Sequence, residues 1–171
     1  IGQPLTLSVN LTERQFRDHE LLRTVNRALR ATGLAPDRLS IEITEPTIAD
    51  DTNAARGTIS RLRSLGVRVV VDEFCGSQVL MRLLPGLGVE QIKLDRSLVN
   101  ALDREWGRTV VASSIDKAAE LGLKVSAVGV ETKEQLAFLA DAGCALVQGY
   151  LFERPLPANR VPAALARLTA G

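Results

Sequence analysis

Acidic and amide side chains recur near the ends of the apolar runs in this sequence. Asn10, Glu42 and Asp72 each lie at such a position, and Glu73 directly follows Asp72. These side chains supply the hard oxygen ligands that suit Mg²⁺, Mn²⁺ or Ca²⁺ better than zinc or copper. Two divalent ions held by shared carboxylates are a recurrent arrangement for hydrolysing phosphodiesters. Lys93, on the next apolar run, is placed to orient a water molecule or to neutralise phosphate charge.

Each residue of this set also has a purely structural explanation. Carboxylates at the ends of strands can form ion pairs around the mouth of a barrel without taking part in any chemistry. For any single residue the structural explanation is sufficient. The whole set, in this order along the chain, favours the metal site.

Amphipathic stretches lie between the apolar runs and must bring these residues together. Phe16, Leu21, Val25 and Leu29 recur at helical spacing, for example. Three of the expected helices end just before a glycine, which can adopt the left-handed backbone that closes a helix. The expected strands are residues 5–10, 39–44, 67–71, 91–95, 124–130 and 145–151. The expected helices are about 12–32, 50–65, 104–121 and 133–142, with a last one from about 159.

The alternation of strands and helices predicts a parallel sheet. Polar residues at the carboxyl ends of successive strands are typical of a (β/α)₈ barrel, although a doubly wound sheet shares part of this pattern. Ser40, Glu42 and Thr44 lie on one face of their strand, which favours the barrel, because a sandwiched central strand would be apolar on both faces. Only about six of eight strands are visible. We therefore expect a TIM-like α/β barrel with roughly 80 further residues before Ile1, or else a smaller variant with an open edge.

The composition excludes several classes of protein. The 171 residues are 46% apolar, and 21 Lys and Arg against 20 Asp and Glu leave a formal charge of +1. This balance argues against a dedicated nucleic-acid-binding protein. No apolar run approaches the roughly 18 residues needed to span a bilayer. Cys75 and Cys144 cannot form a disulfide framework and fit a reducing compartment, so we expect a cytoplasmic location.

Three further residues are expected to be structural. The sole histidine, His19, should be solvated on a charged helix face. Trp106 and Phe138 fall at helical core positions.

Six short motifs occur in order along the chain. They are SVNLT (8–12), EITE (42–45), DEF (72–74), KLDRS (93–97), GVET (129–132), and QGYLF (148–152) followed by Pro155. Together they resemble the EAL domain family, which comprises bacterial cyclic di-GMP phosphodiesterases and their non-catalytic relatives. The resemblance implies a TIM-like barrel with one antiparallel strand. It identifies residues 1–171 as the C-terminal three quarters of such a domain, with the Glu-Ala-Leu segment and its metal-binding glutamate upstream of Ile1.

The resemblance also implies a metal site. The family's metal ligands match Asn10, Glu42 and Asp72. Glu73 stands where the family has a second aspartate, and it is a longer acid that would reach the second metal with altered geometry. Lys93 matches the lysine that contacts the catalytic water. Glu45 matches the acid that anchors the loop after residue 72, a loop that the family links to metal binding and dimerisation.

A cyclic di-GMP pocket is implied by further matches. Asp95 matches the acid on the strand of Lys93, and Glu131 matches the second glutamate of the family's AEGVE sequence. Gln148 matches the glutamine near metal and substrate. Phe152 and Pro155 follow the last strand, where the family has its guanine pocket, although a packing role explains Phe152 equally well.

Two departures from the family pattern bear on activity. Val128 stands where the family has its general-base glutamate, and removing a positioned base typically lowers a rate by 10²–10⁴-fold. Cys75 replaces a glycine in the loop after Asp72, so any positive φ there becomes unfavourable. Its acidic neighbours would raise the pKa of the thiol, which argues against a redox-sensitive cysteine. With the upstream ligand also missing, the implied Mg²⁺ or Mn²⁺ would be weakly bound or absent.

We therefore expect a degenerate EAL domain that serves as a cyclic di-GMP-binding or regulatory interaction module in bacterial second-messenger signalling. One alternative is a weakly active, Mg- or Mn-dependent phosphodiesterase specific for cyclic di-GMP. A further alternative is a scaffold that contacts a protein partner without nucleotide or metal. The expected partners are cyclic di-GMP and neighbouring sensory or diguanylate-cyclase-type domains, with a homodimer as an additional arrangement.

Overall fold

Six parallel strands, paired in the order in which they occur along the chain, form the sheet in the computed structural model, which describes residues 5–168. The strands are β1 (Leu7–Asn10), β2 (Leu39–Thr44), β3 (Arg68–Phe74), β4 (Gln91–Leu94), β5 (Lys124–Val128) and β6 (Leu146–Gln148). The α-helices are α1 (Glu13–Phe16), α2 (Leu21–Thr32), α3 (Glu45–Asp50), α4 (Thr52–Ser64), α5 (Gln78–Leu87), α6 (Arg96–Asn100), α7 (Glu105–Glu120), α8 (Lys133–Asp141) and α9 (Val161–Leu168).

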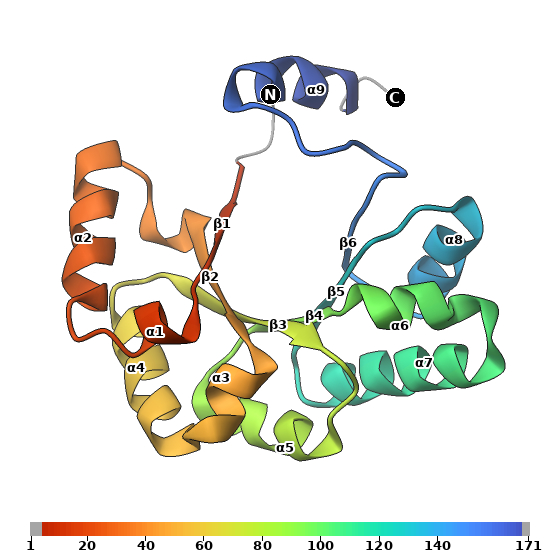
Figure 1. The fold of residues 1–171 in the computed structure, drawn as a ribbon, viewed down its shortest axis with the longest axis horizontal. Coiled ribbons are helices and arrows are strands. Elements are labelled where there is room, and N and C mark those ends of the chain that lie inside the picture. Colours follow the sequence, from red (N-terminus) through yellow and green to blue (C-terminus); the bar gives the residue numbers. More distant parts are fainter. Residues whose placement is uncertain (1–4, 169–171) are drawn as a thin grey trace.

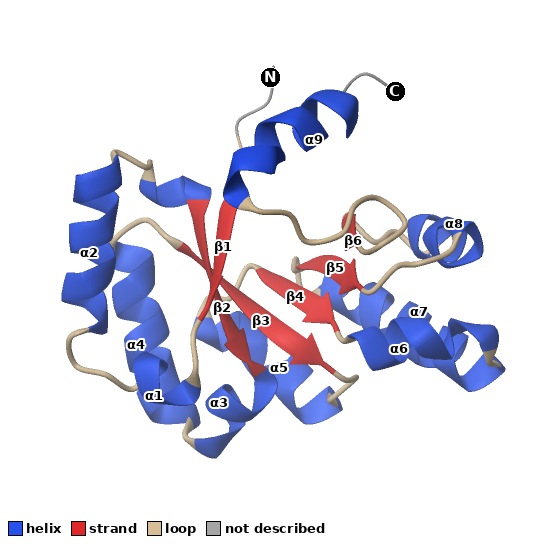
Figure 2. Cartoon of the chain, turned by 45° about the horizontal axis from the view of Figure 1, so that its top comes forward, coloured by secondary structure: helices blue, strands red, loops and turns tan. Residues whose placement is uncertain are grey.

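The sheet curls into part of a barrel, with most of the helices on its outer side (Figures 1 and 2). Its two edges are β1 and β6, which do not pair with each other. Both edge strands expose apolar side chains, with Leu7 53% and Leu146 57% exposed. The expected TIM-like architecture with six strands is therefore confirmed, and all five pairings within the described sheet are parallel. No helix among residues 5–168 is both long and apolar enough to cross a membrane.

The alternation of side chains along the central strands separates the core from the concave face. Apolar residues of β2, β3 and β4 point outward and are buried against the helices, and they are Ile41, Ile43, Val69, Val71, Ile92 and Leu94. Ile59 and Leu62 of α4 and Leu84 of α5 belong to the same buried cluster. Because side chains alternate along a strand, polar residues next to these positions must face the inside of the curled sheet. The functional groups are thus held by strands whose other face is fixed in the core.

The helices differ from the sequence prediction at two breaks. The helix expected over residues 12–32 is interrupted at Asp18, whose side chain accepts a hydrogen bond from the backbone N–H of Glu20 at 2.8 Å. The helix expected over residues 50–65 begins only at Thr52. The preceding residue, Asp51, caps α4 by accepting a hydrogen bond from the N–H of Ala54 at 3.0 Å. Asp favours this role because its short side chain bonds to nearby backbone donors. The sequence prediction also missed three helices, α3, α5 and α6.

Two further expectations need correction. The last strand is three residues long rather than residues 145–151, because the chain turns at Gly149 and Leu151 donates a backbone hydrogen bond to Val130 at 3.1 Å. Trp106 is not a core residue: it is 53% exposed, in the first turn of α7. Phe138 is partly buried against the core, with the Arg108 guanidinium 5.5 Å from its ring centroid.

A substitution at Gly149 tests how tightly the turn after β6 is packed. A Cβ atom at this position would lie 1.9 Å from the carbonyl oxygen of Val130, so Gly149→Ala must displace backbone. We expect a loss of unfolding free energy on the order of 3 kcal/mol by urea denaturation. Gly57→Ala is the matched control, because nothing lies within 4 Å of its Cβ position inside α4. It should instead stabilise the protein by about 0.5–1 kcal/mol, and equal effects of the two substitutions would contradict this packing.

Candidate functional site

A lysine bridges two carboxylates at the centre of the concave face. Lys93 Nζ donates to Glu42 Oε2 at 2.6 Å and to Asp72 Oδ2 at 3.3 Å. The three side chains are only 13%, 7% and 17% exposed, in the order Lys93, Glu42 and Asp72. They come from β4, β2 and β3, which are neighbours in the sheet. The structure thus brings together three of the residues that the sequence singled out.

Asn10 lies beside this cluster in strand register but at the edge of the sheet. It pairs with Glu42 across β1 and β2, and the next residue, Leu11, donates a backbone hydrogen bond to the carbonyl of Glu42 at 2.9 Å. Asn10 itself is exposed. Asn10 is therefore next to Glu42 in register, and among residues 5–168 no hydrogen bond joins its side chain to the cluster.

The polypeptide at Glu73 has an unusual conformation. Glu73 has φ +55°, the only positive φ outside glycine among the described residues, and its N–H donates to its neighbour Asp72 Oδ1 at 2.9 Å. A non-glycine residue in this region costs roughly 1–2 kcal/mol. The side chain is exposed, and in the described structure no hydrogen bond or ion pair joins it to Lys93 or Glu42. Its expected role as a metal ligand remains a prediction.

The loop after β3 is tied to the start of α3. The N–H of Cys75 donates to Glu45 Oε2 at 3.4 Å, a long hydrogen bond in the place where the sequence predicted a loop anchor. Partial burial, followed by the charges of Asp95 and Glu45, raises the pKa of the Cys75 thiol. Since the thiolate is the reactive form, this environment disfavours reaction of the cysteine.

Asp95 has a local structural role. Its carboxylate accepts a hydrogen bond from the N–H of Ser97 at 2.8 Å and caps α6. The hydrogen bond from the Ser97 side chain, followed by those from the backbone, lowers the pKa of Asp95. Asp95 does not line either of the hollows described below, so its expected place in a ligand pocket is untested.

Two adjoining hollows lie on the concave face, and Val128 and Gln148 line both. The inner hollow, of about 240 Å³, also contains Glu42, Lys93 and Ser126. The outer hollow has a volume of about 380 Å³. Its other principal lining residues are Arg96, Glu131, Tyr150, Arg154 and Pro155.

The outer hollow combines two arginines with an aromatic ring. Arg96 forms an ion pair with Glu131, and its guanidinium lies 6.0 Å from the ring centroid of Tyr150. Arg154 lies 4.6 Å from the same centroid. Gly129 allows this arrangement because a Cβ there would be 2.4 Å from Cγ of Arg96. Cationic and aromatic groups of this kind suit the phosphates and bases of a nucleotide.

The sequence prediction and the observed lining overlap in part. Glu131, Gln148 and Pro155, which the resemblance assigns to a ligand pocket, line the outer hollow, whereas Phe152 is 40% exposed and lines neither hollow. The roles of all four residues in ligand binding remain predictions. Arg96 and Arg154 were missed. Both stand directly beside predicted site residues, and their cationic side chains after the ends of strands were a signal for phosphate binding.

The donor atoms fit a hard divalent cation in type. Glu42 and Asp72 offer carboxylate oxygens, and Mg²⁺ is commonly held by one or two carboxylates together with substrate phosphates. Within residues 5–168, however, no group of three or more Asp, Glu, His or Cys side chains is gathered to hold a metal ion. Both carboxylates already contact the Lys93 ammonium, so a cation would compete with it.

The buried ion pairs of Lys93 generate a stability prediction. Lys93→Met would leave Glu42 buried without its partner, and breaking a buried pair typically costs about 3–5 kcal/mol. We expect a loss of this size in the free energy of urea unfolding at pH 7. Lys93→Met combined with Glu42→Leu should recover part of it. Lys124→Met, at an exposed lysine that begins β5, is the matched control, and an equally large loss there would refute the role of burial.

The lowered pKa of Asp95 predicts how its contribution depends on pH. Asp95→Ala removes the cap of α6 and should cost about 1 kcal/mol near pH 7. A carboxyl group whose pKa is lower in the folded state stabilises the fold above its unfolded pKa of about 3.9, and this contribution is lost as the pH falls through the folded value. The difference between wild type and Asp95→Ala should therefore shrink below about pH 4 in urea titrations. Asp95→Asn keeps a capping oxygen, so a loss at pH 7 equal to that of Asp95→Ala would count against the cap.

The sequence of this chain is similar to sequences of known proteins. The chain matches the EAL domain over residues 2–155. It is 34% identical over 161 residues to the bifunctional diguanylate cyclase/cyclic di-GMP phosphodiesterase MucR of Pseudomonas aeruginosa, covering 94% of this chain and 24% of that protein. The chain spans about a fifth to a quarter of the length of the first curated relatives that it matches.

Solved structures show the same fold. The complex of the PaMucR phosphodiesterase with c-di-GMP has a TM-score of 0.87 and 32% identity, over 91% of this chain and 64% of that one. The manganese/cy-diGMP complex of Klebsiella pneumoniae BlrP1 has a TM-score of 0.79 and 31% identity, over 88% of this chain and 39% of that one. With the polar strand ends gathered on one concave face and a family match over nearly its whole length, this chain belongs to the EAL domain family.

Proposed function

We propose that this chain is a regulatory EAL domain that binds cyclic di-GMP without efficient hydrolysis. The observation that carries the proposal is Val128, which lines both hollows at the carboxyl end of β5. Its hydrocarbon side chain cannot take a proton from an attacking water, and loss of a positioned base typically lowers a rate by 10²–10⁴-fold. Ligand-binding groups remain around it, with Lys93 and Gln148 in the inner hollow and Arg154 in the outer one.

The paired hollows fit the chemistry of a cyclic dinucleotide. Such a ligand carries paired phosphates and paired purine bases, so it needs two adjoining compartments. Gln148 lies between the compartments, and the stacked Arg154 and Tyr150 provide a cationic aromatic surface in the outer one. The complexes of PaMucR and BlrP1 with c-di-GMP support this choice of ligand.

A divalent cation has a secondary place in this proposal. Mg²⁺ or Mn²⁺ bound at Glu42 and Asp72 would polarise a phosphate oxygen of the ligand. The manganese in the BlrP1 complex supports this assignment. Because the ammonium of Lys93 holds the same two carboxylates, we infer that the cation binds weakly. Lys93 can itself neutralise phosphate charge.

One observation favours the weakly active phosphodiesterase as a second candidate. Lys93, Glu42 and Asp72 remain together on adjacent strands, so a water or another carboxylate could replace the missing base at a low rate. As for partners, we infer that sensory or diguanylate-cyclase-type domains receive the signal, a choice supported by the name of MucR and its greater length. A homodimer is a further arrangement of the same proposal. A nucleotide-independent scaffold would leave the two hollows without a role.

Calorimetric titration of the chain with cyclic di-GMP, with and without Mg²⁺, tests the proposal. We expect saturable heat with a dissociation constant on the order of 10 µM or tighter. Gln148→Ala removes hydrogen-bonding groups shared by both hollows and should weaken binding about tenfold. Asn53→Ala, an exposed amide on α4 far from the hollows in sequence and fold, should leave it unchanged. Absence of binding heat in the folded wild type would reject the receptor function.

A further inference from the structure

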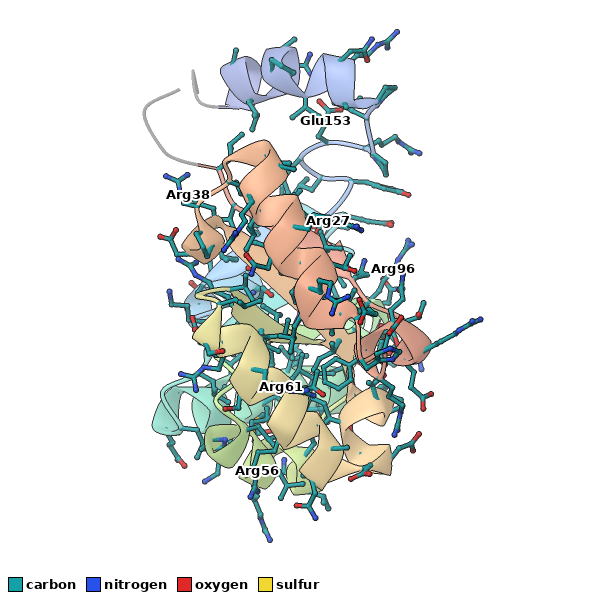
Figure 3. All side chains as sticks on the ribbon, turned by 90° about the vertical axis from the view of Figure 1, so that its left-hand side faces the viewer. Arg27, Arg38, Arg56, Arg61, Arg96 and Glu153 are labelled. Atoms are coloured by element: carbon teal, nitrogen blue, oxygen red, sulfur yellow. The ribbon has the colours of Figure 1, made fainter. Side chains whose placement is uncertain are left out.

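Two helices on the outer side of the barrel carry only one sign of charge. Arg23, Arg27 and Arg30 lie on α2, and α4 carries a second set of three: Arg56, Arg61 and Arg63. Neither helix contains Asp, Glu or Lys. All six arginines are exposed. Figure 3 looks onto this side, with Arg27 on α2 and Arg61 and Arg56 on α4 below it.

The arginines of α2 form a regular stripe. Leu21, Val25 and Leu29 fix one face of the helix in the core, so the arginines at 23, 27 and 30 lie on the opposite face at spacings of four and three residues. The stripe extends about 10 Å along the helix axis. Like charges at these spacings repel one another and weaken the isolated helix by roughly 0.2–0.5 kcal/mol per pair. A partner with the opposite charge would relieve this repulsion.

Most of these guanidinium groups are available for a partner. Of the six, only Arg23 has an ion pair in the described structure, with Glu20 at 2.9 Å. Arg30 donates to Asn26 in its own helix, and Arg27 forms no side-chain hydrogen bond or ion pair with any residue in the described range 5–168. Arg23, Arg27 and Arg30 also line a shallow hollow on the helix surface together with Asn26 and Ala31.

We propose that the arginine stripe of α2 docks a carboxylate-rich helix of a protein partner. A guanidinium fork binds a carboxylate through two parallel hydrogen bonds. Glutamates repeating every four and three residues on a second helix would match the stripe pair by pair. α4 extends the same positive surface beside it.

The surface offers other anionic partners charge alone. None of the exposed large hydrophobic residues lies on α2 or α4, so there is no apolar group to insert into a membrane and no ring to stack on a nucleic-acid base. A second copy of this chain is a poor match. Its long acid-bearing helices, α7 and α8, mix Glu and Asp with Lys or Arg.

The test uses fluorescence anisotropy with a labelled helical peptide of three heptads, bearing Glu at positions that repeat every four and three residues. Wild type should bind it, and a matched peptide with Gln in place of Glu should not bind. The triple variant Arg23→Glu, Arg27→Glu and Arg30→Glu should weaken binding at least about tenfold. The triple Lys variant at the same positions should weaken it about threefold, because it keeps the charge and loses the fork.

The control variant changes the net charge equally at exposed positions elsewhere: Lys124→Glu, Lys133→Glu and Arg160→Glu. It should bind the peptide within about twofold of wild type at the same ionic strength. If the Glu triple fails to fold, single Arg27→Glu at the unpaired arginine should still weaken binding about threefold. Equal losses in the control and the stripe variant would overturn the proposal. So would tighter binding of wild type to phosphatidylserine vesicles or to a 20-base-pair DNA duplex than to the Glu peptide.

Discussion

The concave face depends on one interaction, the contact of the Lys93 ammonium group with the carboxylates of Glu42 and Asp72. It joins three adjacent strands through side chains that are almost removed from water. Removing the positive partner of these two carboxylates would be costly, because burial of an unpaired charge is strongly unfavourable. The opposite face of the same strands is fixed by Ile43, Val71 and Ile92 in the core. Each strand thus joins an apolar outer face to a polar inner one.

In the receptor function that we propose, this arrangement separates binding from chemistry. The groups that would attract and orient an anionic ligand are Lys93 in the inner hollow, Arg154 stacked on Tyr150 in the outer hollow, and Gln148 between them. The position at the end of β5 that would handle a proton is occupied by the hydrocarbon side chain of Val128. Electrostatic attraction alone lowers the free energy of a bound ligand, whereas hydrolysis also requires a group that changes its protonation state during the reaction.

The sequence predicted the sheet well because its signals are local. The alternation in residues 39–44 placed Glu42 on the polar face, and the order of strands followed from their helical crossovers. The meeting of Lys93 with Glu42 and Asp72 depends on contacts between distant segments, yet parallel strands place their carboxyl ends at one edge, so it could be anticipated. The positive φ of Glu73 and the exposure of Trp106 could not, because both are set by tertiary packing that residue type does not reveal. Arg96 reaches Glu131 only because Gly129 leaves room for it, a steric condition that appears in three dimensions alone.

Binding of cyclic di-GMP without hydrolysis is tested by a ³¹P NMR time course of the dinucleotide with the wild-type chain, in a buffer that contains Mg²⁺ and no Mn²⁺. One spectrum reports both ligand binding and hydrolysis, because binding shifts and broadens the phosphodiester signal and hydrolysis creates a new phosphomonoester signal. We expect a broadened phosphodiester signal that persists for hours without a phosphomonoester signal. Rapid appearance of the phosphomonoester, or an unperturbed phosphodiester signal at saturating protein, would contradict it.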